Sequence, residues 1–153
     1  MGRVLFTRPL VAHAEELAFT IQPADREELV AFGEQSTYRA LLRSVSLSAH
    51  AWTALLDRRV LAMFGVCWTS TLTGDATLWL LTSTLVDAHR KTFVVAARRA
   101  LDELKTQWPR LRVGIDFHHN RAIRFAASSG FTVGPIAAHR VTGAPVTNVS
   151  LGA

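Results

Sequence analysis

Hydrophobic positions follow two periods along the chain, and each period predicts one type of element. Apolar residues spaced as Phe93, Val94, Ala97, Leu101 and Leu104 are typical of a helix, whereas short or alternating apolar runs are typical of strands. Helices are predicted over residues 12–19, 23–32, 36–42, 88–107 and 120–129. Strands are predicted over residues 4–7, 52–56, 60–68, 76–82, 112–117, 131–133, 136–141 and 145–150.

Start and stop signals mark the ends of these elements. Pro23 is suited to a first helical turn, Ser36 can cap the next helix, and Gly33 and Gly130 are typical helix stops. Pro109 ends the long helix. That helix lies between the strands predicted over 76–82 and 112–117, so a right-handed crossover should make the two strands parallel neighbours.

The order of elements predicts an α+β fold, a mixed and strongly twisted sheet flanked by helices. No repeat, low-complexity block or linker divides the chain. We therefore expect a single domain over residues 1–153, with an N-terminal arm over about 1–11.

Composition and charge narrow the possible classes of protein. Among 153 residues, 49% are hydrophobic and 19% charged, which excludes a disordered chain. No apolar run reaches the roughly 18 residues of a membrane span, and the N-terminus lacks a signal-peptide core, so we expect a cytoplasmic protein or one packaged from a cytoplasm. Cys67 is the only cysteine and is expected to be a buried, inert thiol.

The formal net charge is +5, and the pI is about 10.6. Such a surface favours an acidic partner, for example nucleic acid, a phosphorylated cofactor or an acidic protein face, although a solvated surface explains it too. No recognition motif for nucleic acid is present, so nucleic acid is a possible partner only through the charge.

Residues 120–131, Asn-Arg-Ala-Ile-Arg-Phe-Ala-Ala-Ser-Ser-Gly-Phe, form a short helix that runs through glycine into a strand. The segment resembles the last conserved segment of the GNAT acyltransferase superfamily. Together with residues 21–29, 61–66, 78–82 and the long helix, it looks like the GNAT-like proteins of tailed phages related to internal virion protein A. The resemblance covers roughly residues 20–135 and implies the GNAT fold.

The resemblance also implies where a cofactor would lie. Acetyl-CoA in that family occupies a cleft between two splayed parallel strands, here 76–82 and 112–117, which brings Leu81 and Thr82 beside the pantetheine and Asn120 near the cofactor. The family's glycine-rich pyrophosphate turn is replaced here by Leu-Val-Asp-Ala-His-Arg-Lys-Thr over 85–92.

Two interpretations compete for this turn. The side chains of His89, Arg90 and Lys91 could bind the phosphates in place of backbone N–H groups. We favour the other, in which Asp87 caps the long helix and takes those N–H groups, because capping needs one ordinary residue.

Catalytic candidates are few. The family's usual tyrosine acid falls at Ala126, and the only tyrosine, Tyr38, lies in the early helices. Asp116 and His118 share one face of a strand, so their carboxylate and imidazole could pair and act as the base that deprotonates an amine. Capping of the last helix by His119 or Asn120 is the simpler explanation of this segment, and no set of ligands for a metal is visible.

We therefore predict a degenerate GNAT-fold phage virion or virion-assembly protein, working through protein contacts without acyl transfer and without a cofactor. Its partners would be other phage virion proteins or further copies of itself, in the bacterial host cytoplasm or the virion. The alternative is an acetyl-CoA-dependent N-acetyltransferase with a nonstandard pyrophosphate turn. A third hypothesis is a nucleic-acid-associated protein guided by charge.

Overall fold

The observed elements follow the predicted order. A computed structural model describes residues 3–70, 75–116, 119–139 and 142–150. The strands are β1 (Val4–Thr7), β2 (His50–Leu56), β3 (Arg59–Ser70), β4 (Asp75–Thr82), β5 (Arg110–Asp116), β6 (Thr132–Ala138) and β7 (Pro145–Ser150). The helices are α1 (Val11–Thr20), α2 (Pro23–Ala31), α3 (Thr37–Leu47), α4 (Leu85–Ala88), α5 (Arg90–Gln107) and α6 (Asn120–Ser128).

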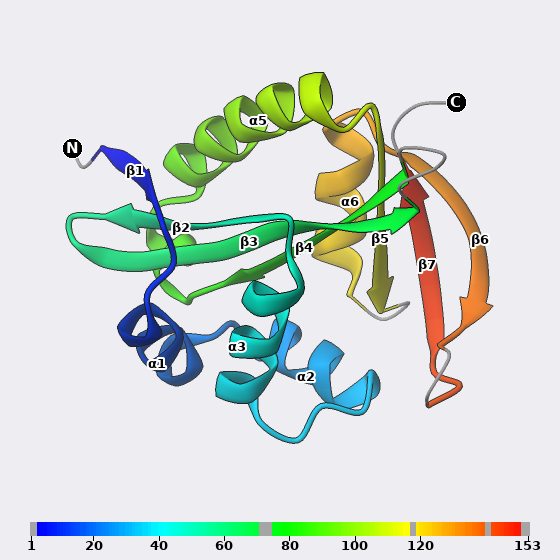
Figure 1. The fold of residues 1–153 in the computed structure, drawn as a ribbon, viewed down its shortest axis with the longest axis horizontal. Helices are drawn as coiled ribbons and strands as arrows, with labels where there is room; N and C mark the ends of the chain where they lie inside the picture. The colour runs from blue at the N-terminus through cyan, green and yellow to red at the C-terminus, as the bar shows by residue number, and fades with distance from the viewer. Residues whose placement is uncertain (1–2, 71–74, 117–118, 140–141, 151–153) are drawn as a thin grey trace.

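The described strands form one mixed sheet in the order β1-β2-β3-β4-β5-β7-β6. Helices α1, α2 and α3 lie on one side of the sheet, and α5 and α6 lie on the other (Figure 1). Residues Val4–Thr7, within the expected N-terminal arm, pair with β2 at one edge. The α+β single-domain prediction is confirmed.

Apolar residues pack on both faces of the sheet. Leu101 and Leu104 of α5 are buried in one cluster with Leu111 of β5. Leu17 of α1 and Leu41 of α3 are buried in a second cluster that also reaches β3 and β4. Each fully buried leucine stabilises the fold by roughly 2 kcal/mol, so both helical layers are held firmly against the sheet.

Strands β4 and β5 are parallel neighbours, as predicted from the long helix between them. Their ladder is short: it joins Asp75–Thr77 to residues 110–112 and goes no further. Beyond Arg112, strand β5 continues antiparallel to β7, where Asp116 is opposite Val146. The two parallel strands thus diverge in the middle of the sheet.

The start of the long helix differs from the prediction. Residues Leu85–Ala88 form the separate short helix α4, and α5 begins only at Arg90. The N-cap of α5 is His89, whose backbone (φ −135°, ψ 42°) interrupts the helical path. The prediction that Asp87 caps the long helix is therefore wrong, because the break places Asp87 in the preceding turn.

Other boundaries shift by a few residues. Helix α3 runs on to Leu47 instead of ending at 42, while Ser36 caps it as predicted, accepting the Arg39 N–H at 3.2 Å. Strand β6 spans Thr132–Ala138 with a register shift between Val133 and Ile136, and the predicted end of that strand at 140–141 lies outside the described residues. None of the described helices is long and apolar enough to cross a membrane.

Candidate functional site

The divergence of β4 and β5 leaves one side of β4 without a strand partner after Thr77. Backbone groups of a strand point alternately to its two sides, and the N–H and C=O of Thr82 point away from β3, toward Asp25 and Gln22. By the same alternation, the backbone N–H and C=O groups of Leu78 and Leu80 face the gap. The gap therefore offers donors and acceptors along the extended middle of β4.

A cavity of about 590 Å³ opens at this gap. Its lining comes from β4 and β5, from α5 and α6 on one side, and from α2 on the other. Apolar side chains dominate, including Leu78 and Leu80 of β4, Phe93 of α5 and Phe125 of α6. Such a cavity suits the uncharged, extended part of a ligand.

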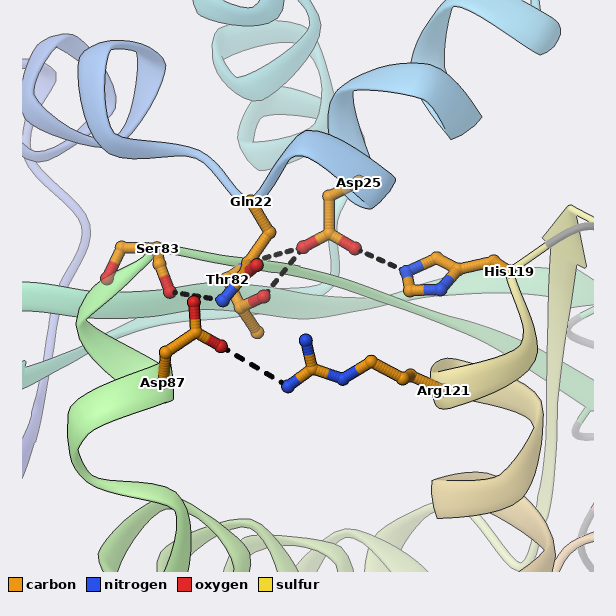
Figure 2. A network of polar contacts seen from close by, with 7 residues as sticks. All are labelled: Gln22, Asp25, Thr82, Ser83, Asp87, His119 and Arg121. Carbon is orange, nitrogen blue, oxygen red and sulfur yellow. Dashed lines mark hydrogen bonds and ion pairs between the residues drawn. The ribbon is translucent and has the colours of Figure 1, made fainter.

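A buried polar network closes the end of β4, and Figure 2 shows its members. The Asp25 carboxylate accepts hydrogen bonds from the backbone N–H of Thr82 (2.9 Å) and from its hydroxyl (2.7 Å) through Oδ2. Its Oδ1 lies 2.8 Å from Nε2 of His119. The side chains of Asp25 and His119 are only 9% and 10% exposed, so little water competes for these contacts.

Local sequence explains how Asp25 reaches β4. Helix α2 begins with Pro23, and its N-cap Gln22 donates from its backbone N–H to the carbonyl of Thr82 at 2.9 Å. The Gln22 side chain also donates to the carbonyl of Ser83 at 3.2 Å. The first turn of α2 is thus fixed against the end of β4, and Asp25, the third residue of that turn, accepts the Thr82 N–H, which has no strand partner.

A second bridge crosses the site closer to solvent. Nη2 of Arg121, in the first turn of α6, lies 3.3 Å from Oδ1 of Asp87 in α4. Both side chains are half-exposed. Arg90, Arg121 and Arg124 all line the cavity, so its outer part is cationic and Asp87 neutralises only part of that charge.

Some of the residues predicted to bind the cofactor line the cavity, and others do not. Leu81, Thr82 and Arg90 line the cavity. His89 is the N-cap of α5, and Lys91 is an exposed residue of its first turn. Asn120 is the first residue of α6, and its side chain lies outside what the structure describes. Their binding of a cofactor stays a prediction.

The structure describes only one of the three predicted catalytic side chains, so the pairing of Asp116 with His118 stays a prediction. Tyr38 lies in α3 and packs against the second core cluster. Asp116 ends β5, its side chain is outside the described set, and His118 lies outside the described residues altogether. Among the described residues, no group of three His, Cys, Asp or Glu side chains could hold a metal.

The sequence alone did not predict the pairing of Asp25 with His119 or the place of Arg121 in the site. An acid in the first turn of a helix, such as Asp25, is favoured by the helix dipole alone, and the sequence indicates His119 only as a possible cap of α6. The structure shows no side-chain cap by His119 and directs its ring to Asp25 instead. The two residues are 94 positions apart in the chain, so only the tertiary fold brings them together.

Comparisons with known proteins identify the fold. No protein-family model matches the chain, and no curated protein sequence matches it. Solved structures do match over nearly the whole chain. An aminoglycoside N(6')-acetyltransferase from Legionella pneumophila has a TM-score of 0.71 at 17% identity, covering 99% of this chain and 92% of that one.

Two further acetyltransferases agree. The ribosomal-protein-S18-alanine N-acetyltransferase from Escherichia coli has a TM-score of 0.69 at 11% identity, covering 97% of this chain and 92% of that one. The microcin C7 self-immunity acetyltransferase, solved with acetyl-CoA and AMP, has a TM-score of 0.69 at 9% identity, covering 99% and 93%. The resemblance to phage virion proteins finds no support in these matches, whereas the chain has the fold of the GNAT acetyltransferases.

Proposed function

We propose that this protein is an acetyl-CoA-dependent N-acetyltransferase. The observation that carries the proposal is the early end of the β4–β5 ladder at Thr77, which leaves the backbone of Leu78 and Leu80 facing a cavity. A strand with one open side can pair with the amide groups of a pantetheine arm as it would with a neighbouring strand. The cavity volume, about 590 Å³, is typical of small-molecule sites.

The charge around the cavity supports a phosphorylated acyl donor. Arg90, Arg121 and Arg124 line the outer part, and guanidinium groups bind phosphate oxygens in a bidentate manner. Among the described residues, no side chain caps α5, so the N–H groups of its first turn are available to an anion. The capping by Asp87 that argued against phosphate binding at this turn is absent, which strengthens the roles proposed for His89, Arg90 and Lys91.

One observation favours a second candidate, a protein with this fold that binds acetyl-CoA but does not transfer the acetyl group. Ala126, at the position of the family's usual tyrosine acid, is buried in the first core cluster and has no proton to donate. An enzyme built on this chain must therefore move protons with another group.

Acetyl transfer to amines tests the proposal. Purified protein is incubated with acetyl-CoA and a panel of primary amines, comprising polyamines, an aminoglycoside and peptides with free N-termini, and products are identified by mass spectrometry. We expect an acetylated amine and an equal amount of CoA that both depend on the protein. If no amine is acetylated while acetyl-CoA binds, the second candidate is correct; if acetyl-CoA does not bind either, the cleft has another ligand.

A further inference from the structure

We propose that Asp25 and His119 form the proton-transfer centre of the acyl transfer, with His119 as the catalytic residue and Asp25 as the residue that positions it. This inference rests on the proposed function. It starts from the short contact between two nearly buried side chains, Nε2 of His119 at 2.8 Å from Oδ1 of Asp25, at the C-terminal end of β4. Both residues line the cavity.

The contacts of Asp25 determine which ring nitrogen of His119 carries hydrogen. Oδ2 accepts two hydrogen bonds from Thr82, as expected of an ionised carboxylate, which can only accept. The contact with Oδ1 therefore requires a hydrogen on Nε2 of His119. In the neutral imidazole the lone pair then lies on Nδ1, on the side of the ring turned away from the carboxylate (Figure 2).

Other groups at the cavity are poorly suited to this role. The titratable side chains among its described lining residues are Asp25, Glu28, Arg90, His119, Arg121 and Arg124. Guanidinium groups do not give up a proton in proteins, and a carboxylate, although it can act as a base, ordinarily has a pKa further from neutral pH than an imidazole has. The imidazole alone exchanges protons in that range. Among the described residues, the charges that face it are those of Asp25 and Glu28 from α2, Arg90 from α5, Arg121 and Arg124 from α6, and Asp87, which forms an ion pair with Arg121.

The amine nitrogen attacks the thioester carbonyl carbon while Nδ1 of His119 takes one amine proton, so the C–N bond forms and the imidazole becomes imidazolium. Asp25 stabilises that charge from the Nε2 side. When the C–S bond breaks, the sulfur keeps the bonding electron pair and takes the proton from Nδ1, which regenerates the neutral ring. One imidazole then serves as base and as acid, which compensates for the missing tyrosine at Ala126.

Steady-state acetyl transfer, measured from pH 5 to 9 on the full chain, tests this role. We compare the wild type with Asp25→Asn, His119→Gln and the control His50→Gln, whose histidine is exposed and stacks edge-on against Trp52. For His119→Gln we expect kcat to fall by about 100-fold or more, the loss of rate at acid pH to disappear, and acetyl-CoA affinity to change by less than about three-fold. Asp25→Asn should lower kcat about ten-fold and move the acid limb of the profile to lower pH, because the imidazolium loses its carboxylate partner. His50→Gln should match the wild type.

Each alternative outcome is decisive. Wild-type kcat and an unchanged acid limb in His119→Gln would overturn the inference while leaving the proposed acetyl transfer intact. Failure of the wild type to transfer acetyl groups to any amine would overturn both. If thermal melting shows that His119→Gln is unfolded, the acid limb of Asp25→Asn decides: a shift to lower pH supports the pair, and an unchanged limb contradicts it.

Discussion

Asp25 shows how one side chain can hold three elements in place. Its carboxylate, on α2, accepts hydrogen bonds from Thr82 on β4 and contacts His119 beside α6. The residue is 6% exposed, so these contacts replace nearly all of its hydration. A buried carboxylate is tolerated only when its hydrogen-bonding capacity is used in this way.

Replacing Asp25 with alanine should therefore destabilise the protein strongly. The change leaves the buried Thr82 N–H without its acceptor and removes the carboxylate from the His119 ring, and we expect the free energy of unfolding in urea to fall by about 3 kcal/mol. Asp102→Ala is the matched control. The Asp102 side chain is 78% exposed, and its Oδ1 lies 3.7 Å from Nζ of Lys105, which is too long for a strong hydrogen bond. Its loss should cost less than about 0.5 kcal/mol. Equal effects of the two changes would contradict the structural role of Asp25.

At the scale of elements, the divergence of β4 and β5 is what makes a cleft in an otherwise continuous sheet. The short ladder ends at Thr77, and the break at His89 sets the start of α5 above the opening. The helix then presents Arg90 to the cavity, while Arg98, about two turns further along, lines a separate shallow site.

The position of Arg90 predicts its effect on the acyl donor. Calorimetry with acetyl-CoA should show that Arg90→Ala weakens binding about ten-fold, because one charge-assisted contact with phosphate is lost. Arg98→Ala removes the same charge from the same helix and should change the dissociation constant by less than about two-fold. If Arg98→Ala weakened acetyl-CoA binding more than Arg90→Ala does, the phosphates would not bind at the start of α5.

Most element boundaries could be predicted because they depend on local signals. Ser36 caps α3, and Gly33 and Gly130 take positive φ values of 87° and 96° after α2 and α6, as helix stops do. Asp87 misled the prediction because an acid before a long helix resembles a cap, whereas the chain turns once more through α4. The pairing of Asp25 with His119 could not be predicted, since Asp25 is held by the Thr82 N–H, which lacks a strand partner only because β4 and β5 diverge.

For the whole molecule, the net positive charge favours an anionic ligand. The chain carries a formal charge of +5, and arginines line the outer part of the cavity. Solved acetyltransferases share the fold at identities of 17% or lower, so backbone geometry is what these proteins have in common with the chain. Self-association, expected from the sequence, stays a prediction that light scattering can check.

Acetyl-CoA binding should depend on ionic strength. Raising NaCl from 50 to 500 mM shortens the screening length several-fold, and we expect the dissociation constant to rise about five-fold. Acetyl-pantetheine, which has no phosphate, is the control ligand and should bind with little dependence on salt. Equal salt dependence of the two ligands would show that the arginines at the cavity do not contact the phosphates.

The most direct test of the central claim is a titration of isotope-labelled protein with acetyl-CoA, followed by the amide signals of β4. We predict saturable shifts at Leu78 and Leu80, whose N–H groups face the gap, with a dissociation constant in the micromolar range, equivalent to about 8 kcal/mol. The amide signal of Leu17 in α1, which is buried in the second core cluster and away from the residues that line the cavity, should move much less. An absence of saturable shifts at Leu78 and Leu80 at millimolar acetyl-CoA would contradict the claim that the cleft between β4 and β5 binds an acyl donor.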